Sequence, residues 1–186
     1  MNIINALFQD LNVFYISNNE KFSITNPLYT QTNNSEILTW YNYQTKQYFY
    51  TYDEYYSWVV NNLQYSLAID NKVLIQMYYV QKEKNITQAS LSFLPHPDLL
   101  MSYFRFDMDT ISCKDYYHNS YHANFGYRSD DIRFSLNRFP HPSEFLRFVL
   151  FLLGYEEFKA FNRKRFFEDL NSLGEQYSHN FDFTLT

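Results

Sequence analysis

Two Pro-His-Pro triplets limit where helices and strands can run in this chain. Pro95-His96-Pro97 and Pro140-His141-Pro142 hold four of the five prolines and two of the five histidines. Proline fixes its own φ, lacks an N–H donor and biases the preceding residue toward extended backbone. We therefore predict that each triplet is a stiff, extended connector between secondary elements. The competing hypothesis is that His96 and His141, held in similar local geometry, face each other as a chemical pair.

The length and composition of the chain predict one domain with an aromatic core. The chain has 186 residues, which is enough for a single domain with a substantial interior. Aromatic residues make up 22% of it, which is a high fraction, so much of the core is expected to be aromatic. The net charge of -5 argues against a protein whose whole surface attracts nucleic acid, but it is compatible with a local basic patch.

Neither secretion nor membrane association is expected. The single cysteine, Cys113, cannot form an internal disulfide, and no basic-then-apolar leader opens the sequence. The longest apolar run, Phe148–Leu153, is far shorter than the roughly 18 residues of a membrane span. These features predict a soluble protein of the reducing cytoplasm.

The first third of the chain predicts two helices separated by less regular structure. Residues 2–16 place apolar side chains at helical spacing, which predicts a first helix. Residues 51–54 (Thr-Tyr-Asp-Glu) have the form of a capping box, which predicts that a second helix begins there. Between them, residues 22–50 are polar and aromatic, and short strands or irregular structure are expected.

The last third of the chain also predicts two helices. Pro142 suits the first helical position, and Glu144 suits the third, where its charge meets the positive end of the helix. This helix is apolar on nearly all sides and is expected to end at Gly154. A final helix is predicted from Glu156 to about Leu173.

The middle of the chain predicts an antiparallel sheet. From residue 65 onward, β-branched and aromatic runs alternate with turn residues, which favours a meander. The runs are residues 66–69, 73–81, 86–93, 99–106, 121–127 and 132–136. They predict one sheet of about five or six strands. With the helices at both ends, the sequence predicts a single α+β domain over residues 1–186.

Potentially reactive side chains are concentrated in residues 96–141, which hold four of the five histidines. Alternate residues of a strand point to the same face of a sheet. Tyr103, Arg105 and Asp107 are therefore predicted to share one face, with Arg133 on a neighbouring strand. A face that bears Arg, Asp, Tyr and His side chains is a candidate polar pocket.

One interpretation of this region is a metal site. His118 and His122 are four residues apart, and Asp107, Asp109 or His96 is a candidate third ligand. Two imidazoles and a carboxylate can hold a divalent ion. The alternative is that a loop histidine and a strand histidine pair with backbone or carboxylate groups.

A second interpretation is metal-free phosphodiester chemistry. A histidine would act as general base and acid, and an arginine would stabilise the negative charge of the transition state. RNA supplies its own nucleophile, so His with Arg or Tyr suffices. The candidate catalytic residues are His122, Arg105, Arg133, Tyr103 and His141. The alternative is that the Arg and Asp side chains form cross-strand ion pairs on a solvated sheet face.

A short basic run and the absence of cofactor motifs complete the inventory. Arg163, Lys164 and Arg165 are candidate phosphate or nucleic-acid contacts, although such a run is also typical of the solvated face of an amphipathic helix. The sequence has no phosphate-binding glycine loop, serine elbow or paired-cysteine zinc motif. We therefore expect no cofactor.

The order of several segments supplies a family resemblance. The segments are Tyr65–Gln81, Leu91–Pro97, Tyr103–Asp107, His122 with Gly126, Ile132–Phe134, and Pro142 with Phe145, Phe148, Val149 and Leu150. Over roughly residues 50–155 this arrangement resembles the bacterial domain of unknown function 2290. The family has no established activity. The resemblance implies an intracellular bacterial protein encoded by an accessory gene, as are components of toxin–antitoxin and phage-defence systems. The chain departs from the family at Asp70-Asn71-Lys72, where a turn glycine is more frequent.

Two functional hypotheses follow. The first is a non-catalytic partner-binding or regulatory subunit of such a system, whose partner is another protein encoded nearby. It is favoured by an aromatic-rich, acidic, single-domain chain without a decisive motif, since aromatic residues are common at interface cores. The second is a small nuclease or phosphotransfer-type toxin that uses the polar region to act on RNA or a nucleotide.

Overall fold

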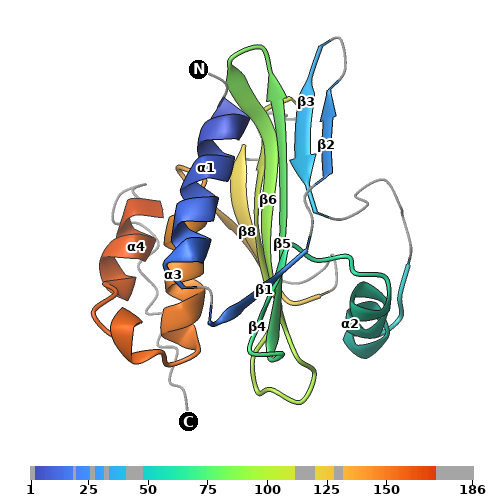
Figure 1. Cartoon of the computed structure of the whole chain (residues 1–186), viewed down its shortest axis with the longest axis vertical. Helices are drawn as coiled ribbons and strands as arrows, with labels where there is room; N and C mark the ends of the chain where they lie inside the picture. The colour runs from blue at the N-terminus through green and yellow to red at the C-terminus, as the bar shows by residue number, and fades with distance from the viewer. Residues whose placement is uncertain are drawn as a thin grey trace.

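A nine-stranded antiparallel sheet with helices on both faces forms the described part of the molecule (Figure 1). The computed structural model describes residues 3–18, 20–25, 28–31, 34–40, 48–111, 120–127 and 132–170. The class is α+β, as predicted. No helix in these residues is both long and apolar enough to span a membrane.

The long strand β5 organises the sheet. The strands are β1 (Phe22–Ile24), β2 (Leu28–Gln31), β3 (Glu36–Thr39), β4 (Leu67–Ile69), β5 (Val73–Lys82), β6 (Asn85–Pro95), β7 (Phe104–Asp109), β8 (Tyr121–Phe125) and β9 (Arg133–Ser135). The order is β1-β4-β5-β6-β7-β8-β9. On the edge opposite β6, the first half of β5 pairs with β4, and its second half pairs with β3, which in turn pairs with β2.

The sheet is larger than the five or six strands predicted, and the extra strands lie in residues 22–39. β1, β2 and β3 are only three or four residues long and lie in a polar stretch without clear alternation. They are stabilised by pairing: β5 has ten residues, and β4 covers only three of them, so β3 can pair with the remainder. Such tertiary pairing is not visible in a local pattern.

The helices cover the two faces of the sheet unequally (Figure 1). They are α1 (Ile3–Ile16), α2 (Tyr52–Asn61), α3 (Pro142–Leu152), the single 3₁₀ turn η1 (Glu156–Phe158) and α4 (Arg163–Leu170). α1, α3 and α4 pack on one face, and α2 lies on the other. The larger aromatic core lies under α1 and α3, where the Phe145 ring contacts Phe104 and Phe106 at centroid distances of 6.1 and 5.9 Å.

The helix boundaries follow local signals where those signals are strong. The predicted capping box is present at α2, since the Thr51 hydroxyl accepts from the Glu54 N–H at 3.2 Å and the Glu54 carboxylate accepts from the Thr51 N–H at the same distance. α3 starts at Pro142, as predicted. Beyond α3, Gly154 has a φ of +77°, a left-handed conformation that favours glycine.

The prediction of one continuous helix from Glu156 to about Leu173 is wrong. η1 ends at Phe158, and α4 begins at Arg163. Asn162 explains the break, because its side-chain oxygen accepts from the Arg165 N–H at 2.9 Å and thereby caps a new helix. Residues 171–173 lie outside the described residues.

The two triplets act as connectors, as predicted. β6 ends at Pro95, and the N–H of His96 donates to the carbonyl of Lys72 at 2.7 Å. His141 is extended, with φ −65° and ψ 142°, and immediately precedes α3. The two histidines do not face each other. The His96 ring packs on Tyr56 of α2, whereas His141 lies with α3 on the opposite face of the sheet.

Two buried tyrosine hydroxyls in the main core have no hydrogen-bond partner in the described part of the chain. They belong to Tyr15 of α1 and Tyr79 of β5, which are 5% and 2% exposed. Burial raises the pKa of both phenols well above the usual value, so both are neutral. A buried polar group without a partner costs roughly 1–3 kcal/mol of stability.

We expect the substitution Tyr79→Phe to stabilise the protein by about 1 kcal/mol, because it removes an unpaired buried hydroxyl and keeps the ring. The matched control is Tyr55→Phe. The Tyr55 hydroxyl donates to Gln76 at 2.9 Å, so its removal should destabilise by about 1 kcal/mol. Urea denaturation of the three proteins checks both signs. A loss of stability in Tyr79→Phe would show that this hydroxyl is hydrogen-bonded.

Candidate functional site

The alternation of β7 separates an apolar face from a polar face. Phe104, Phe106 and Met108 are buried, whereas Arg105 and Asp107 are only half-buried. The phenylalanines point toward α3. Alternate residues point to opposite faces, so Arg105 and Asp107 lie on the face away from α3.

Cross-strand register gathers six polar side chains on that face. Asp107 lies opposite Ser90 of β6 and His122 of β8. Two residues earlier on β7, Arg105 lies opposite Asn124 of β8, which in turn lies opposite Arg133 of β9. We call this group the Asp107 cluster; its members are Ser90, Arg105, Asp107, His122, Asn124 and Arg133.

The Asp107 carboxylate is the hydrogen-bonding centre of the cluster. Its Oδ1 accepts from the Ser90 hydroxyl at 2.9 Å. Its Oδ2 accepts from Arg105 Nε at 2.6 Å and from Asn124 Nδ2 at 2.8 Å. The Nε2 atom of His122 lies 3.4 Å from the same oxygen. Four residues from three strands therefore converge on one carboxylate.

Asp107 is held in its charged form. Burial raises the pKa of its carboxyl, but the His122 hydrogen bond, the Arg105 charge and the Ser90 hydrogen bond outweigh it, so the pKa lies below its usual value. A carboxylate of this kind is a poor proton donor near neutral pH. Its geometry suits it to orient Arg105 and His122.

The two arginines lie at the outer part of the cluster. The Arg105 side chain is 40% exposed, whereas those of Asp107 and His122 are 17% and 7% exposed. Arg133 is exposed, and its Nε donates to Asn124 Oδ1 at 2.9 Å. The Asn124 amide thus links Arg133 to Asp107, because its Oδ1 accepts from Arg133 and its Nδ2 donates to Asp107. The result is a fixed carboxylate beneath two oriented guanidinium groups.

Tyr103 lies beside the cluster, within a group of tyrosines. It is 8% exposed and lies immediately before β7, two residues ahead of Arg105. Its ring is 6.2 Å from that of Tyr127 and 6.5 Å from that of Tyr55. The Tyr55 and Tyr127 rings stack at 5.0 Å and 26°. Tyr52 of α2 also contacts Tyr103 and Tyr127, and we call these four residues the tyrosine cluster.

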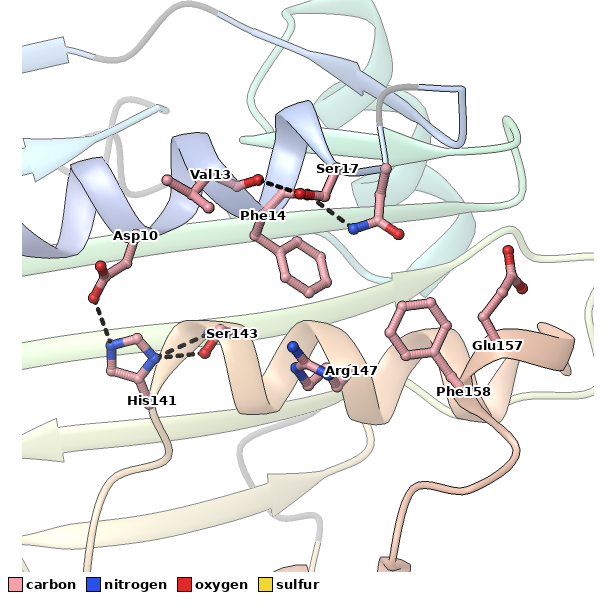
Figure 2. Close-up of a pocket in the computed structure, with 10 residues that line it drawn as sticks. Asp10, Val13, Phe14, Ser17, His141, Ser143, Arg147, Glu157 and Phe158 are labelled. Atoms are coloured by element: carbon pink, nitrogen blue, oxygen red, sulfur yellow. Dashed lines mark hydrogen bonds and ion pairs between the residues drawn. The ribbon is translucent and has the colours of Figure 1, made fainter.

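His141 belongs to a different place, an open groove between α1 and α3 (Figure 2). Its Nε2 lies 3.6 Å from Asp10 Oδ2, and its Nδ1 lies 2.8 Å from the Ser143 hydroxyl. Carboxylate, imidazole and hydroxyl are adjacent here, but the two ring nitrogens are exchanged relative to a serine-hydrolase triad, in which Nδ1 faces the carboxylate and Nε2 faces the hydroxyl. The same Nδ1 also accepts from the backbone N–H of Ser143 at 3.3 Å, so the ring caps α3. Asp10 is largely exposed, and His141 is partly exposed.

The structure thus brings together Arg105, His122 and Arg133, and it places Tyr103 next to them. It does not bring His141 there. Sequence reasoning missed Ser90 and Asn124 as members of the site. Strand alternation could have predicted Asn124 as a site residue, because it stands two residues after His122 in a predicted strand and so shares its face. Ser90 had no such signal, because only the register of β6 on β7 places it beside Asp107.

The metal interpretation rests on residues that are only partly described. His118 lies outside the described residues. His122 and Asp107 are neighbours, but the described residues contain no group of three or more His, Cys, Asp or Glu side chains placed to hold a metal ion. A metal site at His118, His122 and Asp107 stays a prediction.

The basic run lies on α4, which packs on the face of the sheet opposite the Asp107 cluster (Figure 1). Lys164 and Arg165 are exposed, and Arg163 is half-buried. Lys164 lies 3.7 Å from Glu168, and Arg165 lies 3.8 Å from Asp169, both one helical turn further on. Pairs of this kind are typical of a solvated helix face and contribute little stability.

Comparisons with protein-family models, with curated proteins and with solved structures yield no match for this chain. The resemblance to the domain of unknown function 2290 therefore stays a prediction.

We expect Asp107→Asn to destabilise the protein by roughly 2–3 kcal/mol near neutral pH, because the partners of the carboxylate lose a charged acceptor. The folded pKa of Asp107 lies below its unfolded value of about 3.8. The contribution of the carboxylate is therefore complete above about pH 4 to 5 and is lost as the pH falls through the folded pKa. The difference between wild type and variant should shrink from pH 7 to pH 3 in urea denaturation.

The control is Asp98→Asn, since the Asp98 side chain is 90% exposed and, among the described residues, its ion pair is to the partly exposed His96. Its stability difference from wild type should be small at every pH. A difference for Asp107→Asn that stays constant down to pH 3 would contradict the lowered pKa of Asp107.

Proposed function

We propose that this protein is a non-catalytic, partner-binding or regulatory subunit of a bacterial phage-defence or toxin–antitoxin-like system. Its recognition surface is the polar sheet face that carries the Asp107 cluster. The partner is another protein encoded nearby, which presents an acidic group to Arg105 and Arg133.

The hydrogen bonding of Asp107 carries this proposal. The carboxylate accepts from Ser90, Arg105 and Asn124, so its bonds come from within the protein itself. A network of this kind fixes the shape and charge of a surface before any partner arrives, which lowers the entropy cost of binding. Arginines oriented in this way are frequent among the residues that dominate interface energies.

The choice of a defence-type system rests on the family resemblance over roughly residues 50–155. The resemblance to accessory bacterial genes is an analogy, and it selects which proteins to test first. The products of the adjacent genes are the first candidates.

The test is co-expression with the products of the adjacent genes, followed by light scattering on a sizing column and calorimetric titration. We expect a defined complex. Arg133→Ala should weaken it at least about tenfold, since a fixed guanidinium is lost at the surface. Arg165→Ala on α4 is the matched control and should bind as wild type. A monodisperse monomer that binds none of these products would contradict the proposal.

A second candidate is metal-free cleavage of RNA, which the grouping of His122 with Arg105 favours. Asp107 lies 3.4 Å from His122 Nε2 and 2.6 Å from Arg105 Nε, so it can orient a general base and a phosphate-binding group together. His122 would take the proton of the ribose 2′-hydroxyl as its oxygen attacks phosphorus, and would return a proton to the 5′ oxygen as the P–O5′ bond breaks. Arg105 would stabilise the phosphorane, so no cofactor is needed.

This candidate predicts that His122→Ala and Arg105→Ala, made separately, each slow the cleavage of a labelled RNA at least about 100-fold. Circular dichroism and thermal unfolding should show that both variants remain folded. Addition of a chelator separates metal-dependent from metal-free cleavage. Unchanged rates in both variants would remove the Asp107 cluster from consideration as a catalytic site.

A further inference from the structure

Arg105 and Arg133 form a pair suited to grip one anion. They occupy the same row of the sheet, on β7 and β9, with Asn124 of β8 between them. Adjacent strands are about 4.8 Å apart, so their backbones are separated by about 10 Å. Long side chains can close that gap around a single phosphate, which accepts hydrogen bonds on several oxygens.

Both guanidinium groups are held at Nε by the sheet itself. Arg105 donates to Asp107 at 2.6 Å, and Arg133 donates to Asn124 at 2.9 Å. A guanidinium fixed at Nε keeps the plane of its remaining N–H groups in one orientation. The six residues of the Asp107 cluster include two arginines and one carboxylate, so their formal charge favours an anion.

An aromatic surface begins next to this pair. Tyr103 lies immediately before β7, two residues ahead of Arg105, so their Cα atoms are at most about 7 Å apart. Beside Tyr103, the stacked rings of Tyr55 and Tyr127 are only half-buried. The Tyr55 hydroxyl also donates to Gln76 of β5. Gln76 lies opposite Ser92 of β6, and Ser92 lies opposite Arg105 of β7, so these three residues form one row across the sheet.

We propose that this surface binds a nucleoside phosphate, with the phosphate between Arg105 and Arg133 and the base against the Tyr55–Tyr127 pair. Arginines on an antiparallel sheet, with tyrosine rings beside them, suit both parts of such a ligand, since any base has a face that stacks on tyrosine. The inference rests on the proposed function in one respect, namely that this sheet face is the recognition surface.

The chemistry is the same whether the nucleoside phosphate is a free nucleotide or part of a single RNA strand. The probes are therefore AMP, GMP, a fluorescein-labelled eight-nucleotide RNA of mixed sequence, and inorganic phosphate. Titration calorimetry measures binding of the small probes, and fluorescence anisotropy measures binding of the RNA. Tighter binding of RNA identifies a strand as the source, and tighter binding of AMP or GMP identifies a free nucleotide.

Substitutions test the phosphate-binding arginines and the base-binding tyrosines separately. Arg133→Ala should weaken the binding of nucleoside phosphates at least tenfold, and Arg133→Lys should restore part of the lost affinity. Tyr127→Ala should weaken the binding of the nucleotides and of the RNA, while the weak binding of inorganic phosphate stays unchanged. Arg147→Ala is the matched control, because Arg147 lies on α3 over the Phe14 ring, on the other side of the sheet.

Three results would overturn the inference. They are no binding of any probe at millimolar concentration, wild-type affinity in Arg133→Ala, and binding of inorganic phosphate as tight as that of AMP. The same preparations are then tested with the products of the adjacent genes. A protein that binds such a product but no nucleoside phosphate leaves the proposed function intact, whereas a protein that binds neither removes both.

Discussion

The two-residue period of the central strands is the constraint on which this structure depends. On β7 it sends Phe104 and Phe106 into the core under α3 and sends Arg105 and Asp107 to the opposite face. A shift of one residue in register would bury the charges among phenylalanines and expose the rings. The apolar core therefore fixes the polar cluster, because the packing of one face determines which side chains meet on the other.

The two faces meet the cost of burying polar groups in different ways. On the polar face, the buried parts of Asp107 and His122 contact each other, and Asp107 accepts further hydrogen bonds, which offsets the loss of water. In the aromatic core, the hydroxyls of Tyr15 and Tyr79 lack such partners within the described residues. Large aromatic rings fill the core, and stability there comes from their burial.

Local signals in the sequence predict this fold where a few neighbouring residues decide the outcome. The Thr51–Glu54 capping box predicted the start of α2, and Pro142 predicted the start of α3, because capping needs only residues within one turn. For residues 22–39, where β1 to β3 lie, local patterns left short strands and irregular structure as alternatives, because these strands depend on pairing with distant residues. The break before Arg163 was missed, because it depends on one capping side chain. In the same way, strand alternation grouped Arg105 with Asp107. The position of His141 on the other face was not predicted, because local sequence does not encode which face of a sheet a helix will cover.

The division of β5 between two partners has a consequence for motion. The β2–β3 hairpin is attached to the sheet through residues 36–39 of β3, which pair with the second half of β5. β4 and β1 attach through the first half and belong to a separate ladder. We therefore expect the amide hydrogens of the hairpin to exchange by local opening while the pairing of β5 with β6 persists.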